Sequence, residues 1–316
     1  MNSAPCVQRP VIVIAGPTAS GKSDVAMELA KIMSIEIVCA DARTVFAGLD
    51  IGTAKPSAVD RQRVRHHCVD IVAADQSFTA SDFASAARRA IDAMPDSVTP
   101  VVVGGSGLYI TALIDGFSEG VAVADDDIRE QLARELEECG REHMFAVLES
   151  IDPRAARMYA DKNPRRVLRA LEYYRATGKT FSSTWDTPRS ASHYNTLMFG
   201  VHRDRDVLRD RIAARCAEMW NRGLLNETRD LLEHGIAETA QSLSSIGYSQ
   251  AIDVLRGRCT LEKAQYSLLQ ATWQYAKRQL TWFKKDQRFM WLSGTEAASA
   301  ADIKRIHHER LLTKDA

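Results

Sequence analysis

Residues 16–23 read G-P-T-A-S-G-K-S, a spacing of glycine, lysine and hydroxyl that is typical of a phosphate-binding loop (P-loop). In such a loop, backbone N–H groups and the positive end of the following helix converge on a phosphate pair. Lys22 adds a point charge, and the Ser23 hydroxyl is placed to hold Mg²⁺. The loop predicts a bound di- or triphosphate, but it does not say whether that phosphate is consumed, transferred or expelled. Its expected phosphate-binding residues are Gly16, Pro17, Thr18, Ala19, Ser20, Gly21, Lys22 and Ser23.

Three charged residues could act on such a ligand. Asp41 follows a predicted strand over 35–39, and ligands of open α/β sheets lie beyond the carboxyl ends of strands. A carboxylate beside bound phosphate is costly unless it has a function, so we interpret Asp41 as a functional residue rather than an N-cap or a solvated turn residue. Arg211 and Arg215 share a face of a predicted helix over 206–220. This pair suits a phosphate clamp, although a surface arginine pair is the commoner arrangement.

The elements that must position these residues follow from hydrophobic spacing. An apolar, β-branched run over 11–14 precedes the loop, and helical spacing follows over 24–30. Further strands are predicted at 69–72, 100–103, 196–201 and 289–292. The predicted fold class is α/β, a P-loop NTPase-like parallel sheet flanked by helices, with an all-helical insertion domain.

The strand over 100–103 runs directly into G-G-S-G-L-Y. A nucleoside triphosphatase would usually end such a strand with a metal-binding aspartate. Its absence favours a reaction that needs no γ-phosphate machinery.

The strand signal vanishes between residues 125 and 180. Amphipathic helices are predicted over 125–139 and 142–149, and Pro153 and Pro164 stand where new helices could begin. Residues 154–179 are locally basic, which suits a polyanion surface, although a solvated helix face is by itself the commoner explanation. We predict a core domain over 1–118 and 194–316 and a helical insertion domain over 119–193.

Composition excludes several classes of protein. The chain carries 41 Lys and Arg against 41 Asp and Glu, so no global field attracts it to nucleic acid or an anionic membrane. No apolar run approaches the roughly 20 residues that cross a bilayer, and residues 1–9 lack the apolar core of a signal peptide. Six scattered cysteines without a C-x-x-C pair indicate reduced thiols in a cytoplasmic protein.

Seven motifs in order resemble those of the tRNA dimethylallyltransferases. They are G-P-T-A-S-G-K-S at 16–23, A-D-A-R at 40–43, D-I-G-T-A-K-P at 50–56, V-G-G-S-G-L-Y at 103–109, R-R-V-L-R-A-L-E at 165–172, I-G-Y at 246–248 and A-K-R-Q-L-T-W at 276–282. The resemblance implies transfer of the dimethylallyl group from dimethylallyl diphosphate to N6 of the adenosine adjacent to the tRNA anticodon, with release of diphosphate. It implies tRNA and dimethylallyl diphosphate as partners. It also implies a helical tRNA-binding region at the C-terminal end of the core domain, and contact of the insertion over 119–193 with the tRNA anticodon stem-loop. We expect Mg²⁺ as cofactor, no membrane partner and a monomer.

The resemblance also assigns roles to residues. The general base falls on Asp41, the diphosphate-gripping arginine on Arg215, and the threonine near the leaving group on Thr18. Contacts to tRNA fall on Asp41, Ala42, Arg43, Thr44, Ser106, Arg129, Arg165, Arg166, Val167, Leu168 and Arg169. The chain departs from the family pattern at Phe46, Ser106 and Trp273, where Tyr, Thr and Arg are common.

Three other functions are weighed against this one. An isopentenyltransferase acting on free adenine nucleotides would share the chemistry but would not need the basic insertion. A P-loop kinase would use Asp41 to accept a substrate hydroxyl proton. An RNA-binding GTPase-like module is disfavoured because no guanine-reading Asn/Thr-Lys-x-Asp motif is present.

Overall fold

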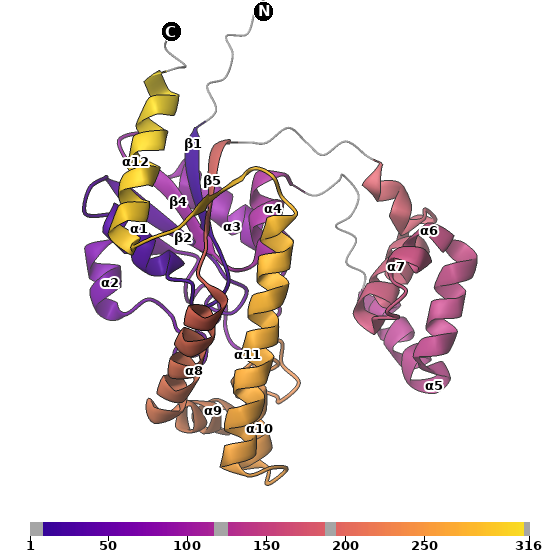
Figure 1. The fold of residues 1–316 in the computed structure, drawn as a ribbon. Coiled ribbons are helices and arrows are strands. Elements are labelled where there is room, and N and C mark those ends of the chain that lie inside the picture. The colour runs from indigo at the N-terminus through magenta and orange to yellow at the C-terminus, as the bar shows by residue number, and fades with distance from the viewer. Residues whose placement is uncertain (1–8, 117–125, 187–193, 313–316) are drawn as a thin grey trace, which may run out of the picture. The chain divides into compact units, whose positions relative to one another are not determined.

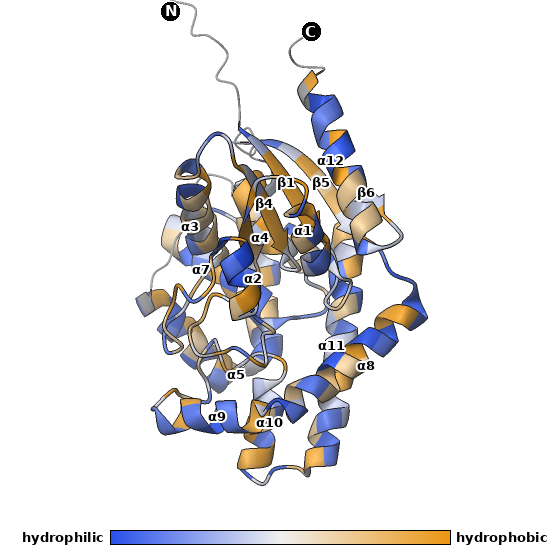
Figure 2. Ribbon diagram, turned by 90° about the vertical axis from the view of Figure 1, so that its left-hand side faces the viewer, coloured by the Kyte–Doolittle hydropathy of each residue, from blue (hydrophilic) through white to orange (hydrophobic). Residues whose placement is uncertain are grey.

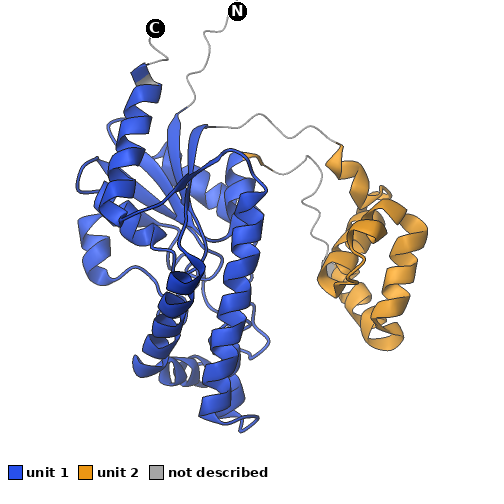
Figure 3. Cartoon of the chain, in the orientation of Figure 1, with its two compact units in different colours: residues 1–114, 193–316 blue, residues 115–192 orange. Residues whose placement is uncertain are grey.

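The structure, a computed structural model, describes residues 9–116, 126–186 and 194–312. The chain divides into two compact units, residues 1–114 with 193–316 and residues 115–192 (Figure 3). The predicted domain boundaries at 118–119 and 193–194 fall outside the described residues or at their edge. Each unit is therefore considered by itself.

A parallel six-stranded sheet forms the centre of the first unit, with strand order β3-β2-β4-β1-β5-β6 (Figure 1). The strands are β1 (Pro10–Ala15), β2 (Ile35–Ala40), β3 (His66–His67), β4 (Thr99–Gly104), β5 (Asn195–Val201) and β6 (Phe289–Leu292). The central strand β1 places Ile12 between Val101 of β4 and Leu197 of β5. Its apolar run is continuous because helices cover both faces of the sheet. The predicted α/β fold class is confirmed.

Helices enclose this sheet on its two faces. α1 (Lys22–Leu29) and α12 (Glu296–Leu312) lie on one face, and α3 (Ala80–Asp92) and α4 (Gly107–Ile114) lie on the other (Figure 1). The core beneath α1 and α12 is closed by buried aliphatic side chains from both helices and from β1, β2, β4 and β5. Figure 2 shows the central strands as an apolar band, whereas the helices carry polar residues as well. Because β1, β2 and β4 are parallel, their carboxyl ends lie at the same edge of the sheet.

Helices beyond β5 complete the unit at that edge. They are α8 (Arg205–Asn221), α9 (Leu224–Glu233), α10 (Tyr248–Leu255) and α11 (Leu261–Lys284). α11 packs against α8, α10 and α4. α2 (Ala58–Arg63) lies between β2 and β3 in the sequence.

One predicted strand is wrong. The run over 69–72 is not a strand, and β3 lies earlier, at His66–His67. Cys68 and Asp70 adopt φ angles of 59° and 56°, in the left-handed region that an extended strand excludes. The Asp70 carboxylate is held by Arg61 at 2.8 Å and by Lys55, so ion pairs override the β propensity of the valines and isoleucine.

The described part of the second unit is all helical. It contains α5 (Asp126–Ile151), α6 (Pro153–Met158), α7 (Pro164–Thr177) and a 3₁₀ helix over Phe181–Trp185. Pro153 and Pro164 stand at the first position of α6 and α7, as predicted. Gly140, with φ of 78°, interrupts α5 between the two helices that the sequence predicts. Buried Leu132, Met144 and Leu171 close a core of its own.

Within the described ranges, no helix is both long and apolar enough to cross a membrane. Five cysteines there are free thiols: Cys39, Cys68, Cys139, Cys216 and Cys259. Cys6 lies outside the described residues.

Candidate active site

The P-loop joins β1 to α1 and presents its backbone to one pocket. Gly21, with φ of 90°, is the N-cap of α1 and offers no side-chain cap, so N–H groups of the first turn stay available to an anion. Ala19 is held at φ of 62°, a conformation that costs an alanine about 1 kcal/mol or more. The Arg211 Nε donates to the Ala19 carbonyl at 2.8 Å and stabilises this turn. The Ser20 hydroxyl is buried without a hydrogen-bond partner in the described chain.

Lys22 and Arg215 supply positive charge inside this pocket. Burial, reinforced by the charge of Arg215, lowers the pKa of Lys22 to about 8. Burial also lowers the pKa of Arg215, and the carboxylate of Asp41 opposes that shift. Among the described residues Arg215 makes no ion pair, whereas Arg211 is occupied by Ala19 and Asp24. Burial makes the charged forms of Lys22 and Arg215 less favourable, and an anionic ligand would stabilise both charges.

The shifted pKa of Lys22 predicts a pH dependence of anion binding. Below about pH 8 the Lys22 ammonium is charged, and the association constant for pyrophosphate has its full value. Above pH 8 the ammonium loses its proton, and the association constant falls by up to about tenfold for each pH unit. Isothermal titration of pyrophosphate from pH 6.5 to 9.5 measures this. The Lys22→Arg variant is the control because arginine stays charged, so the ligand's own titration cancels in the ratio of the two constants. A ratio that is constant across pH would contradict the assignment.

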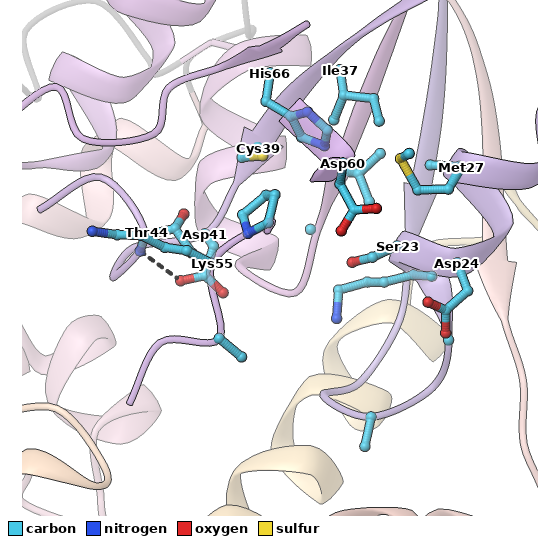
Figure 4. Close-up of a pocket in the computed structure, with 18 of the residues that line it drawn as sticks. Ser23, Asp24, Met27, Ile37, Cys39, Asp41, Thr44, Lys55, Asp60 and His66 are labelled. Atoms are coloured by element: carbon cyan, nitrogen blue, oxygen red, sulfur yellow. Dashed lines mark hydrogen bonds between the residues drawn. The ribbon is translucent and has the colours of Figure 1, made fainter. Parts of the chain in front are cut away.

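Asp41 stands at the end of β2, across the pocket from the start of α1 (Figure 4). Its Oδ1 accepts hydrogen bonds from the N–H groups of Arg43 at 2.8 Å and Thr44 at 3.4 Å. Its Oδ2 accepts none from the described residues, which leaves that oxygen available to a ligand. The Ser106 Oγ accepts from the Ala42 N–H at 3.0 Å and fixes the same turn from β4. The predicted convergence of Asp41 with the P-loop is observed.

The pocket between these groups has a volume of about 580 Å³, within the usual range for small-molecule sites. P-loop residues and Arg215 line one side, Asp41 and Thr44 another, and the loop over 53–56 a third. The Thr44 hydroxyl is buried here without a partner in the described chain. An unpaired buried hydroxyl is costly, so this lining favours a polar ligand.

A glycine replaces the aspartate that a triphosphatase would carry after β4. A Cβ on Gly104 would lie 2.0 Å from the carbonyl oxygen of Ala40, on the neighbouring strand. Because backbone cannot move aside, no side chain fits at this position. The structure thus gives a steric reason for the missing metal ligand.

The oxygen donors of the pocket suit a Mg²⁺ ion that a diphosphate helps to bind. Mg²⁺ usually takes one or two protein oxygens and completes its shell with phosphate oxygens and water. Ser23 is exposed at the start of α1 and lines the pocket. The described residues contain no cluster of three His, Cys, Asp or Glu side chains that could hold a metal unaided. The donor set fits Mg²⁺ shared between Ser23 and a diphosphate.

Sequence reasoning missed Glu227, which holds the pocket wall from α9. Its carboxylate accepts hydrogen bonds from the consecutive N–H groups of Asp50, Ile51 and Gly52 at 2.9 to 3.4 Å. The hydroxyl of fully buried Tyr248 also donates to it, at 2.5 Å. Burial and this carboxylate raise the pKa of Tyr248. The motifs D-I-G-T-A-K-P and I-G-Y are therefore joined through Glu227.

Replacing Glu227 by alanine is expected to lower the free energy of unfolding by about 2 kcal/mol, because three backbone donors and one hydroxyl lose their acceptor. Denaturant unfolding measures the loss. Glu233→Ala, an exposed position on the same helix, is the matched control and should stay within about 0.5 kcal/mol of wild type. Equal stability of the two variants would contradict this role.

The chain matches a known protein family over more than half of its length. The family model described as IPP transferase matches residues 44–286. This chain belongs to the IPP transferase family. It is 40% identical over 289 residues to tRNA dimethylallyltransferase 2 of Geotalea uraniireducens, covering 91% of this chain and 93% of that one. It is 39% identical over 295 residues to the tRNA dimethylallyltransferase of Streptomyces coelicolor, covering 93% of each.

Solved structures of the IPP transferase family share the fold. The full-length tRNA isopentenylpyrophosphate transferase of Bacillus halodurans superposes with a TM-score of 0.72 at 35% identity, covering 98% of each chain. A eukaryotic dimethylallyltransferase described as acting on tRNA superposes with a TM-score of 0.73 at 26% identity, covering 90% of this chain and 74% of that one. The resemblance seen in the motifs is thus confirmed at the level of family and fold.

The insertion of this IPP transferase has fewer free cations than its sequence indicates. Arg129 and Arg169 donate to the buried carboxylate of Glu172 at 2.7 and 2.9 Å, and Arg175 pairs with Glu135.

Arg165 and Arg166 are exposed, Leu168 is partly buried against the core, and Val167 is buried within it. The side chain of Val167 therefore cannot contact RNA. Arg157, Arg165 and Lys179 make no ion pair among the described residues.

Two of the three departures from the family pattern have a structural counterpart. Phe46 is fully buried. The hydroxyl of a tyrosine at this position would need a hydrogen-bond partner inside the core, whereas the phenylalanine ring needs none. Trp273 is flanked by Arg205 and Lys277, with both cations within 6.0 Å of its ring centroid. Positive charge thus lies around Trp273, at one of the positions where the sequence departs from the expected family pattern.

Proposed function

We propose that this enzyme transfers the dimethylallyl group of dimethylallyl diphosphate to N6 of the adenosine adjacent to the tRNA anticodon. One observation carries the proposal: one pocket brings together a P-loop, two cations that make no ion pair with the described residues and, opposite them, a carboxylate oxygen that accepts no hydrogen bond from those residues. That arrangement suits a diphosphate leaving group and a nitrogen nucleophile that must lose a proton. The names of the relatives, which are tRNA dimethylallyltransferases, support the same reaction.

The donor would bind by its diphosphate. P-loop N–H groups, Lys22 and Arg215 surround the phosphates, and the N-terminus of α1 adds its dipole. As the C1–O bond of the donor breaks, negative charge grows on the departing diphosphate. These groups stabilise that charge, with Thr18 beside the leaving oxygen. Mg²⁺, held by Ser23 together with the diphosphate, would supply further charge neutralisation.

The acceptor would be activated by Asp41. The lone pair of the adenine amine is delocalised into the ring, so the amine is a poor nucleophile. Asp41 accepts a hydrogen bond from it, orients it, and takes its proton as the N6–C1 bond forms. A stacked adenine cannot reach this pocket, so the base must be flipped out of the anticodon loop.

Exposed cations and aromatics would hold the RNA. Arg165 and Arg166 on α7 and the basic, aromatic stretch of α11 around Trp273 suit phosphate contact and base stacking. Arg43, whose backbone N–H donates to Asp41, also donates from its guanidinium to the Gln241 carbonyl at 2.5 Å. We further infer that the protein acts as a monomer in the cytoplasm.

A competition assay tests the acceptor. Equal concentrations of tRNA and AMP are incubated with the protein, Mg²⁺ and radiolabelled dimethylallyl diphosphate. Label is expected in tRNA alone. Label in AMP would favour an enzyme of free nucleotides, and formation of ADP from ATP with any acceptor, without labelled RNA, would favour a kinase.

A further inference from the structure

Gln279, on α11, lies between two glycine turns of the pocket and is 6% exposed. Its Oε1 accepts a hydrogen bond from the Thr18 N–H at 2.8 Å, and its Nε2 donates one to the Gly105 carbonyl at 2.9 Å. One end of the side chain must accept and the other must donate, which an uncharged amide does and a carboxylate does not. The side chain thus joins two loops that lie far apart in the sequence.

The two loops carry the two halves of the proposed chemistry. Thr18 belongs to the P-loop, which binds the donor. Gly105 precedes Ser106, whose Oγ accepts from the N–H of Ala42, the residue that follows Asp41. Three hydrogen bonds and one turn therefore connect the P-loop, through Gln279, to the residue beside the general base.

α11 approaches this turn at a second point. Burial raises the pKa of Tyr275, one helical turn before Gln279, to about 12, and the hydroxyl of nearby Ser106 opposes that shift. A Cβ on Gly105 would lie 2.2 Å from the Gln279 Nε2, so the turn closes directly on the amide. The contact leaves no room for the turn to shift toward the helix.

We propose that Gln279 is a positioning residue that sets the spacing between Thr18 and Asp41. The inference rests on the proposed function, in which these two residues act on one donor–acceptor pair. Within the described ranges, the Gln279 amide makes its hydrogen bonds with backbone groups. It acts by holding the leaving group and the amine at reacting distance, where a displacement of about 1 Å can cost about 100-fold in rate.

Gln279→Leu removes both hydrogen bonds at similar volume. We expect kcat for tRNA prenylation to fall by about 100-fold at saturating donor and tRNA, while the dissociation constant for tRNA stays near that of wild type. Gln265→Glu, at an exposed position on the same helix, is the control and should match wild type. A leucine variant with wild-type kcat would overturn the proposal.

Gln279→Glu separates positioning from a general loss of structure. At low pH the introduced carboxyl is protonated, so its O–H can donate to the Gly105 carbonyl while its C=O accepts from Thr18. At high pH its ionised form repels that carbonyl. The ratio of variant to wild-type kcat is therefore expected to rise as pH falls from 9 to 6, about tenfold or more because burial brings the carboxyl's titration into this range.

A flat ratio, including one from a variant inactive at every pH, would overturn the proposal even if the leucine variant fails to fold. Failure of the wild-type chain to prenylate tRNA would be a distinct result, because it would reject the proposed function together with the inference built on it.

Discussion

Replacing Asp41 by asparagine is expected to lower the rate of tRNA prenylation by about 100- to 10,000-fold, the range lost when a general base is removed. Asparagine keeps the Oδ1 that accepts from the Arg43 and Thr44 N–H groups. The turn after β2 should therefore keep its shape. Single-turnover labelling of tRNA with radiolabelled donor measures the loss.

Binding separates this effect from a loss of RNA recognition. A filter-binding assay should give wild-type tRNA affinity for Asp41→Asn. Asp41→Ala should lose activity equally and also unfold at lower denaturant, because two backbone donors lose their acceptor. Undiminished turnover in the asparagine variant would refute Asp41 as the base.

Replacing Arg215 by alanine should lower turnover by about 100-fold, equivalent to about 3 kcal/mol of transition-state stabilisation. The guanidinium lies inside the pocket and has no ion-pair partner among the described residues, so its whole charge is available to the departing diphosphate. Steady-state kinetics with saturating tRNA and varied donor measures the effect. Arg215→Lys should recover part of the loss, since it restores the charge without the planar fork.

Arg209→Ala is the matched control for Arg215→Ala. Arg209 lies on the same helix but is exposed, with Asp206 and Asp210 at 3.8 and 3.9 Å. Exposed pairs of this kind contribute little, so kinetics should stay at wild type. Equal losses in the two variants would show that helix α8, rather than the pocket charge, was disturbed.

Local patterns predicted the parts of the site that local geometry determines. The P-loop follows β1 and opens α1 because a β-branched run, a glycine turn and a helical stretch adjoin one another in the sequence. Asp41 could be placed because strand ends of a parallel sheet share one edge. The wrong strand over 69–72 has the opposite cause: ion pairs from Lys55 and Arg61 hold Asp70 in a conformation that no short-range pattern indicates.

The residues that sequence reasoning missed act over long separations. Gln279 reaches Thr18 across 261 residues, and Glu227 reaches Ile51 across 176. Neither belongs to a residue type that attracts attention at its position, since glutamine and glutamate are common on helices. Gln279 lies within the motif over 276–282, but a motif does not say which of its side chains turn inward, and Glu227 lies in none of the seven motifs.

Mass spectrometry of nucleosides tests the central claim most directly. Unmodified tRNA is incubated with the protein, Mg²⁺ and dimethylallyl diphosphate, then digested to nucleosides, with Asp41→Asn in parallel. We predict a dimethylallyl adenosine from the position next to the anticodon with the wild-type chain, and none with the variant. Unmodified adenosine after incubation with wild type, or equal modification by the variant, would contradict an account in which a P-loop binds the leaving diphosphate and Asp41 activates the adenine amine.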